Sequence, residues 1–451
     1  MPNEYLIKNI NIINENKSFC GSVYIRDNLI YKLFAEKEEI YGLDDKVKII
    51  HGKGKFLIPG IIDTHVHFRD PGLTHKADLL TESKAAIAGG VTSFFDMPNT
   101  IPPVTSRDIL KEKIEIAKNK SLANFAFYIA AAKDNLEDLK NIDKKTTPGI
   151  KIFLGSSTGN LAVNNNEAIL KIFQLENTLI AAHCEDDTII KLNLENYKKN
   201  SKQEIKPNCH PVIRSEEACF VSSEMAIRLA RQYNSRLHLL HISTEKEISL
   251  LNNSTDLSTK KITAEVCVNY LLFDDSFYNT LGNLIKCNPS IKTKKDKAAL
   301  LKALIDNYFD LISTDHAPHT LAEKEKPYLE APSGIPSIQH SLSLALNIFK
   351  TNHIPLIKLV EKMCHNPAIC FKINKRGFIR EGYYADLAIL DFDNKWTADR
   401  NNTLYKCGWS PYDNMTFNAK VTHTFVNGNL VFEKDHFNET FKGKLINFDN
   451  I

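Results

Sequence analysis

The sequence lacks any apolar run of about 18 residues or more, the length that a membrane-spanning helix needs. Its first residues, Met1 to Ile10, lack the basic and then apolar order of a signal peptide. The net charge of +3 is small for 451 residues, and the overall composition is close to that of average globular proteins. We therefore expect a cytoplasmic protein whose main partner is neither nucleic acid nor membrane.

Closely spaced cysteine pairs are also missing. The nine cysteines are scattered along the chain, and none forms a CxxC pair. An odd, scattered set suits reduced thiols better than a disulfide framework or a thiolate zinc site. We expect most of these cysteines to be small buried hydrophobic residues.

Both ends of the chain have the texture of small antiparallel β structure. Residues 3–55 and 378–451 contain short runs that alternate apolar and polar side chains. The second segment also carries an Asn427-Gly428 pair, which is typical of a hairpin turn. We predict that residues 1–55 and 378–451 together form one small β-sandwich domain.

Residues 56–377 show a different pattern, in which apolar strand-like runs are followed by charged segments of helical period. The eight runs are Phe56 to Val66, Val91 to Asp96, Ala123 to Ala131, Gly149 to Leu154, Leu179 to His183, Arg236 to Ile242, Ile262 to Phe273 and Leu311 to Thr314. Eight such units in about 260 residues match an α/β fold of the (β/α)₈ TIM-barrel type. A doubly wound sheet is the alternative.

Polar residues that could carry chemistry stand where these runs end, which is where barrel enzymes place their active sites. The first run closes on His65 and His67. Residues two apart in a strand project to the same side, so both imidazoles can point into the barrel mouth and bind one metal ion. The alternative is a pair of half-exposed strand histidines without a ligand.

Three later runs end in the same way, at His183, His241 and Asp315. Each histidine alone is more often structural, and we assign that role to His238, which we expect to face away from His241. Asp315 opens the segment Asp315 to His319, which adds two more imidazoles. Four histidines and one aspartate at the ends of four strands together favour a metal site.

Lys151 is a cation inside an otherwise apolar strand-like run. Burial there would lower its pKa and favour the neutral amine, which can react with CO₂ to form a carbamate. A carboxylated lysine is an anionic ligand with two oxygens and can bridge two divalent ions. Alternatively, the amine reaches solvent or pairs with a carboxylate.

These motifs resemble those of dihydroorotases, which belong to the cyclic amidase branch of the amidohydrolase superfamily. Asp63 to Gly72 is similar to the signature DxHxHxRxPG, and Asp96 to Thr100 is similar to a second block. The resemblance continues through the barrel at Lys151, His183 to Glu185, His241 to Thr244, Asn288-Pro289 and Asp315 to His319. Two features depart from the pattern. Some branches carry an aspartate in place of Lys151, and Asn288-Pro-Ser-Ile-Lys292 stands where Asn-Pro-Pro-Leu-Arg is expected.

The resemblance implies reversible hydrolysis of the dihydroorotate ring to N-carbamoyl-aspartate, a step of pyrimidine synthesis, with two divalent ions, zinc first among the candidates. It implies that His65, His67 and Asp315 bind the first ion and that His183 and His241 bind the second. Carboxylated Lys151 would bridge the two ions. A hydroxide between the ions would then be the nucleophile, with Asp315 as general base and then general acid.

A substrate carboxylate would need a cationic partner. Arg69 stands two residues beyond His67, so we expect it on the same strand face, and its planar guanidinium matches a carboxylate bidentately. By resemblance, Asn99 and His319 complete this anchor, while Asn288 and the backbone around Ser333 and Gly334 contact the ring. The resemblance also implies a homodimer.

Two rival functions remain open. A hydantoinase or allantoinase would share every metal ligand, but its neutral substrate would leave a buried Arg69 unpaired, which is costly. A non-catalytic partner protein, in contrast, should lack some metal ligands, and none is missing from this sequence.

Overall fold

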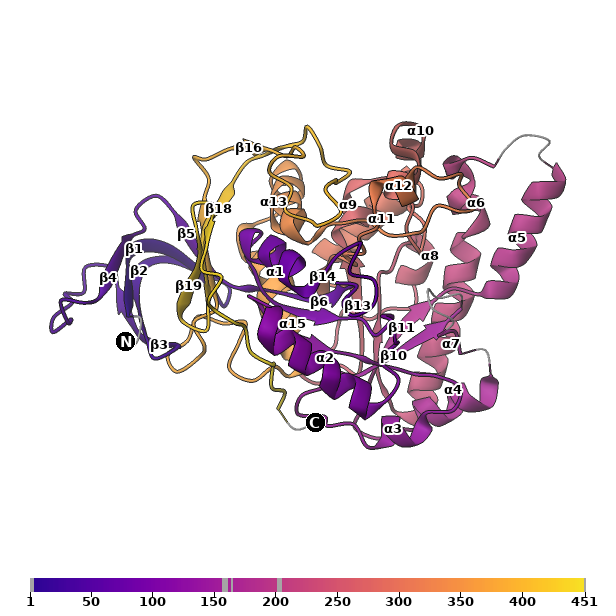
Figure 1. Cartoon of the computed structure of the whole chain (residues 1–451), viewed down its shortest axis with the longest axis horizontal. Coiled ribbons are helices and arrows are strands. Elements are labelled where there is room, and N and C mark those ends of the chain that lie inside the picture. The colour runs from indigo at the N-terminus through magenta and orange to yellow at the C-terminus, as the bar shows by residue number, and fades with distance from the viewer. Residues whose placement is uncertain (1–3, 156–160, 164, 201–204, 450–451) are drawn as a thin grey trace.

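Strands from both ends of the chain form one mixed sheet of nine strands, which is drawn at the left of Figure 1. The order is β20-β19-β18-β15-β5-β1-β2-β3, and β4 pairs with β1. The strands are β1 (Tyr5–Asn14), β2 (Lys17–Arg26), β3 (Leu29–Ala35), β4 (Lys48–His51), β5 (Phe56–Pro59), β15 (Leu387–Asp391), β18 (Lys420–Val426), β19 (Asn429–Glu433) and β20 (His436–Phe437). Ile12, Val23 and Ile389 are among its fully buried core residues. This sheet forms the β-sandwich domain, as predicted.

The computed structural model describes residues 4–155, 161–163, 165–200 and 205–449. None of the helices in these ranges has the length and apolar character that a membrane span requires. The Asn427-Gly428 pair forms the predicted turn between β18 and β19, with φ of 47° and 73°. Two successive residues at positive φ are what a type I′ hairpin turn demands.

The middle of the chain forms the predicted (β/α)₈ barrel. Its parallel strands form two arcs, β6-β7-β8 and β9 to β14 in chain order. Tyr128 separates β8 from β9 at a single barrel position, and a parallel bridge between Val66 and His316 joins β6 to the segment that follows β14. The strands are β6 (Ile61–Val66), β7 (Val91–Asp96), β8 (Asn124–Phe127), β9 (Ile129–Ala130), β10 (Ile150–Leu154), β11 (Leu179–Cys184), β12 (Arg236–Leu239), β13 (Ile262–Cys267) and β14 (Leu311–Ser313).

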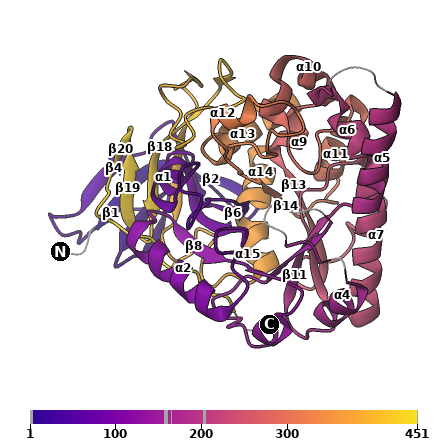
Figure 2. The same cartoon turned by 45° about the vertical axis from the view of Figure 1, so that its right-hand side comes forward.

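Helices surround the barrel, and Figure 2 shows α2, α4, α5 and α7 along its outside. The larger helices are α1 (Leu79–Ala88), α2 (Arg107–Lys120), α4 (Asn166–Phe173), α5 (Asp187–Asn200), α7 (Glu216–Tyr233), α11 (Lys294–Ile305) and α13 (Ser341–Thr351). The shorter ones are α3 (Leu136–Lys140), α6 (His210–Ile213), α8 (Glu245–Ile248), α9 (Val268–Leu272), α10 (Tyr278–Leu281), α12 (Leu321–Lys324), α14 (Leu356–Val360) and α15 (Asn366–Phe371). Side-chain caps begin several of them: the Asp78 carboxylate, for example, accepts from the first turn of α1.

Two of the predicted strand-like runs each contain more than one secondary-structure element. The run from Phe56 to Val66 breaks at Gly60, where a Cβ would lie 2.1 Å from Thr92 Oγ1. Its first half, β5, pairs with β1 and β15 in the sandwich sheet, and only its second half enters the barrel. The domain boundaries stay predictions. This pairing favours Gly60 over residue 55 as the first boundary between the sandwich domain and the barrel. The run from Ile262 likewise ends as a strand at Cys267, where α9 begins.

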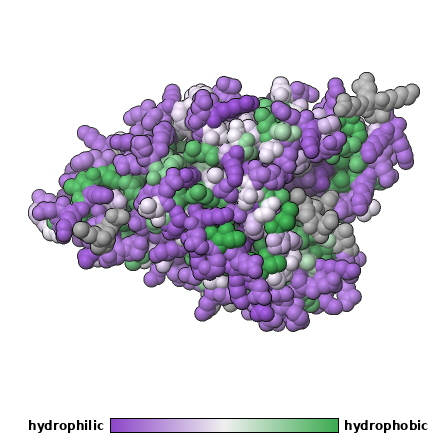
Figure 3. Space-filling model, in the orientation of Figure 1, coloured by the Kyte–Doolittle hydropathy of each residue, from purple (hydrophilic) through white to green (hydrophobic). Residues whose placement is uncertain are grey.

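Apolar side chains fill the barrel interior near the strand starts, where Ile62, Leu179 and Leu311 are buried in one cluster. Phe371 of α15 and Phe448 near the chain end both pack edge-on against Phe95 in the same cluster. Hydrophilic residues cover most of the face seen in Figure 3, and apolar residues appear there in small separate groups. Because apolar side chains fill the barrel near the strand starts, the polar residues inside it lie at the carboxyl ends of the strands.

Candidate metal centre at the barrel mouth

A cavity at the carboxyl ends of the strands gathers nearly all of the predicted site residues. The predicted residues that line it are His65, His67, Arg69, Asn99, Lys151, His183, His241, Asn288, Asp315, Ser333 and Gly334. Phe153 and Ala317 complete the lining, and His319 lies just behind it, next to Arg69. A larger cavity of about 440 Å³ lies at the other end of the barrel, but no predicted residue lines it. The structure thus brings the predicted set together, while the role of each residue stays a prediction.

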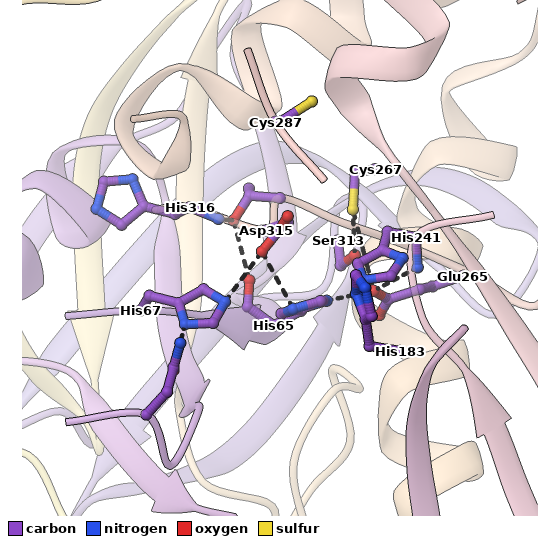
Figure 4. Close-up of polar contacts among 12 residues, drawn as sticks. His65, His67, His183, His241, Glu265, Cys267, Cys287, Ser313, Asp315 and His316 are labelled. Atoms are coloured by element: carbon purple, nitrogen blue, oxygen red, sulfur yellow. Dashed lines mark hydrogen bonds and ion pairs between the residues drawn. The ribbon is translucent and has the colours of Figure 1, made fainter. Parts of the chain in front are cut away.

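Asp315 lies between the two histidines of the HxH pair (Figure 4). Its Oδ1 atom is 3.1 Å from Nε2 of His65 and 3.1 Å from Nε2 of His67. Candidate ligand atoms of these three residues all lie within 4.8 Å of one another. One carboxylate and two imidazoles at such separations are a donor set that suits zinc and related divalent ions.

Hydrogen bonds on the far side of both rings leave their Nε2 atoms facing the cavity. The Nδ1–H of His65 donates to Glu265 Oε1 over 2.6 Å, and the Nδ1–H of His67 donates to Asn99 Oδ1 over 2.7 Å. Histidines that bind metal ions almost always donate their other N–H in this way, which fixes tautomer and ring orientation. The two rings are therefore oriented as ligands.

His183 and His241 form a second group on the other side of His65 (Figure 4). Nδ1 of His183 lies 2.9 Å from Nε2 of His241. Within the described residues, the other nitrogens of both buried rings make no hydrogen bond. Glu185 Oε2 is 3.2 Å from His183 Nε2 without the alignment of a hydrogen bond, and it pairs with Arg214. Buried imidazole nitrogens without a hydrogen-bond partner are costly, and a bound cation is one way to satisfy them.

Lys151 lies on β10 with only 1% of its surface exposed. No acidic side chain of the described ranges forms an ion pair with it; the Phe153 ring is 4.5 Å from its Nζ. Burial lowers the pKa of this amine to about 7, although the charges of Asp315 and Glu265 oppose the shift. Of the two alternatives that the sequence left open, the structure shows the buried amine with a lowered pKa and not one that reaches solvent, while its carboxylation stays a prediction.

Charge and burial act differently on the members of the first group. Burial lowers the pKa of His67 to about 4. Burial also acts against protonation of His65, but the charges of Asp315 and Glu265 outweigh it and raise the pKa to about 9. Asp315 is held well below its usual pKa by His65 and His67, although burial opposes this, so the carboxylate is ionised near neutral pH.

Arg69 is 3% exposed and lines the same cavity. It reaches the cavity through a turn, with φ of 64°, because β6 ends at Val66; the predicted continuation of the strand face does not occur. Its Nε donates to the Pro318 carbonyl over 3.2 Å, and its Nη2 lies 3.2 Å from His319 Nε2. In the described part of the chain no carboxylate forms an ion pair with this guanidinium, which leaves donors for an anionic ligand.

The segment after Asp315 is fixed from two sides. The buried Lys324 amine donates to the carbonyls of Pro332 and Gly334 over 3.0 and 2.9 Å. From the other side, the Trp409 indole N–H donates to the His319 carbonyl over 2.8 Å. These contacts hold the backbone around Ser333 and Gly334 at the cavity wall, where it can meet a ligand.

Glu265 is the main polar residue of the site that the sequence did not reveal. It is fully buried on β13 and lies behind His65. A glutamate inside the apolar run from Ile262 was a signal of the same kind as Lys151. His238 has the structural character expected of it, because it is fully buried outside the cavity lining and its ring nitrogens lie 2.8 Å from Thr263 Oγ1 and 3.2 Å from Glu265 Oε2. His241 lies beyond the alternation of its strand, since β12 ends at Leu239.

Comparisons with known proteins agree with this geometry. A model described as the amidohydrolase family matches residues 56–431. The chain is 32% identical over 426 residues to a dihydroorotase of Methanosphaera stadtmanae, covering 94% of this chain and 93% of that one. It is also 32% identical over 417 residues to a dihydroorotase of Pyrococcus abyssi, covering 92% of each.

Solved structures share the fold. The L-hydantoinase (dihydropyrimidinase) of Arthrobacter aurescens superposes with a TM-score of 0.90 over 97% of both chains at 24% identity. A dihydropyrimidinase of Brevibacillus agri gives a TM-score of 0.85 over 96% of both chains at 19% identity. The resemblance read from the motifs is confirmed: the chain belongs to the amidohydrolase family and is a cyclic amidohydrolase.

Proposed function

We propose that this enzyme is a dihydroorotase, which interconverts dihydroorotate and N-carbamoyl-aspartate in pyrimidine synthesis. The observation that carries the proposal is Arg69, a buried guanidinium without a carboxylate partner among the described residues, which lines the same cavity as the candidate metal ligands. A buried cation of this kind favours a substrate that brings its own carboxylate. The names of the two relatives at 32% identity support the same reaction.

The residues present fit two divalent ions, and zinc suits their imidazole and carboxylate donors. His65, His67 and Asp315 would hold one ion and His183 and His241 the other, with carboxylated Lys151 between them. When bound, the ions lower the pKa of water and withdraw electrons from the scissile carbonyl. Carboxylation can be tested by growth on ¹³C-bicarbonate, which should give a carbamate NMR signal that is absent from Lys151→Ala.

Asp315 is placed to move the proton that hydrolysis requires. Its carboxylate is ionised near neutral pH and faces the cavity between His65 and His67. We propose that it takes the proton of the attacking water and delivers it to the leaving ring nitrogen, as general base and then general acid.

Arg69 would bind the substrate carboxylate, with His319 beside it. Asn99 uses its Oδ1 to accept from His67, which leaves the amide nitrogen to donate to the same carboxylate. Asn288 Oδ1 is buried at the cavity without a hydrogen-bond partner in the described residues, and it can accept a ring N–H. The backbone at Ser333 and Gly334 would complete the contacts to the ring.

The test is an assay of purified protein of known metal content with dihydroorotate, N-carbamoyl-aspartate, hydantoin and allantoin. We expect turnover of the first two, strongly reduced in Arg69→Ala. Arg236→Ala is the matched control, because that arginine bonds the Cys370 carbonyl away from the site. Turnover of hydantoin or allantoin alone would assign a neutral cyclic amide instead, and two bound ions without any turnover would favour a non-catalytic role. Light scattering on the same sample tests the proposed homodimer.

A further inference from the structure

Glu265 is a fully buried carboxylate at the seventh position of the barrel, beneath the candidate metal centre. Both of its oxygens are engaged. Oε1 accepts from His65 Nδ1 over 2.6 Å and from the backbone N–H of His241 over 3.1 Å. Oε2 lies 3.2 Å from His238 Nε2 and 3.5 Å from the Thr64 hydroxyl.

The contacts of Oε1 join the two halves of the site. His65 belongs to the first group of candidate ligands and His241 to the second, and one oxygen atom holds both (Figure 4). The contact to His65 fixes the tautomer that leaves Nε2 facing the cavity. The contact to His241 holds a backbone with φ of 38°, a conformation that side chains other than glycine rarely adopt. This turn carries the His241 ring beyond the end of β12 and toward His183.

We propose that Glu265 is a positioning residue that orients ligands of both metal ions through a single carboxylate oxygen. The inference rests on the metal centre of the proposed function, but it does not depend on which cyclic amide is the substrate. His238 and Thr64 have the complementary task, because they occupy the second oxygen and hold the carboxylate in place.

A role for Glu265 as a ligand in its own right is the competing interpretation. Glu265, His65 and Cys267 do lie close enough together for three donors to share an ion. However, both oxygens of Glu265 are already engaged: Oε1 accepts from His65 Nδ1 and the His241 backbone N–H, and Oε2 faces His238 Nε2 and the Thr64 hydroxyl. His65 Nδ1 is likewise occupied by this contact, so the hydrogen-bonded role is favoured.

Glu265→Gln tests the inference, because it keeps the side-chain shape and exchanges one acceptor oxygen for a donor. Glu247→Gln is the matched control: Glu247 is also buried, but its partners are Ser223, Thr244 and the Ser243 backbone. Zinc affinity and stoichiometry are measured by competition with a chromophoric chelator, and the cobalt-substituted absorption spectrum reports ligand geometry. None of these readouts requires substrate.

We expect zinc affinity at both sites to fall about 10- to 100-fold in Glu265→Gln, with an altered cobalt spectrum, while Glu247→Gln binds like the wild type. Affinity is compared only among proteins with wild-type circular dichroism. If Glu265→Gln does not fold, Thr64→Val and His238→Gln, which release Oε2, should each show a smaller loss at both sites.

Wild-type zinc affinity at either site in folded Glu265→Gln would overturn the inference. Loss of one ion with no change at the other site would overturn it too, because that is the result expected if Glu265 is a direct ligand. Coupled loss of zinc in an enzyme that does not turn over dihydroorotate would keep the inference and reject the proposed substrate. A wild-type protein that binds no zinc or cobalt would reject both.

Discussion

The two halves of the candidate metal centre are built from the same residue types but are supported differently. In the first half, His65 and His67 each donate Nδ1–H to a buried partner, Glu265 or Asn99. In the second half, His183 and His241 face each other at 2.9 Å, and their remaining nitrogens make no hydrogen bond within the described chain.

Both halves contain ligand residues, and the difference lies in what fixes the orientation of their rings. The rings of the first half are held as ligands by the protein itself, so an ion meets an ordered site. In the second half Glu265 holds the backbone of His241, but within the described chain no hydrogen bond fixes either ring from behind, so the final ring orientations depend on the rings' contact with each other and on the ion. We therefore expect tighter binding in the first half and more sensitivity to its supporting residues.

The largest effect is expected for Asp315, the residue of the first half that we propose transfers the proton. Asp315→Asn removes the group that takes and returns the proton, and kcat for dihydroorotate should fall about 10²- to 10⁴-fold. Steady-state kinetics of the zinc-loaded variant measure this, with metal analysis to show that an ion is still bound. Activity within tenfold of the wild type would remove Asp315 from the proton path.

Metal removal tests the comparison directly. Dialysis against increasing chelator should release the two ions in separate steps, with affinities that differ by about 10- to 100-fold, since supporting hydrogen bonds of the ligands are worth that much. The ion that remains should persist in His241→Ala and be lost in His65→Ala. The reverse assignment, or release of both ions in one step, contradicts the difference between the halves.

Asn99→Ala tests the support of the first half alone, because it removes the hydrogen bond to His67 and leaves Glu265 in place. We expect about a tenfold loss of zinc affinity at the tighter site, which is the low end of the range for residues that hydrogen-bond a metal ligand. The affinity of the weaker site should not change. Asn119→Ala on the exposed surface of α2 is the control. An equal loss at both sites would show that the two halves are not supported independently at this point.

The smallest effect is expected outside the metal ligands. Trp409→Phe removes the indole N–H that donates to the His319 carbonyl beside Arg69. A lost hydrogen bond of about 1 kcal/mol corresponds to about a fivefold higher KM for dihydroorotate, with kcat and zinc content unchanged. Trp396→Phe is matched, because its indole bonds the Ala419 carbonyl away from the cavity. A fall in kcat or zinc content would tie the Trp409 contact to the metal centre instead.

The sequence predicted which residues at the strand ends line the site. It did not predict the backbone turns and buried partners that hold these residues. Strand alternation places His65 and His67 on one side because both belong to, or directly follow, β6. The same argument fails for Arg69 and His241, which lie after their strands and have φ of 64° and 38°. A backbone turn of this kind leaves no periodic signal.

Glu265 was missed for a related reason. A single glutamate in an apolar run does not reveal that its partners are His65, 200 residues earlier, and the His241 backbone. The break at Gly60 was equally hidden, because the residues on both sides of it are strand-like. β5 and β6 belong to different sheets, since β5 pairs with β1 and with β15, and β15 lies far along the chain.

That distant pairing also has a consequence for synthesis of the chain. Between Pro59 of β5 and Leu387 of β15 lie roughly 330 residues, which take on the order of 16–66 s to translate at about 5–20 residues per second. The first strands of the sandwich therefore leave the ribosome long before the strands that complete their sheet. During that time the edge of β5 that pairs with β15 has no partner strand, so this domain, although it contains the N-terminal strands, is among the last parts of the protein whose sheet can be completed.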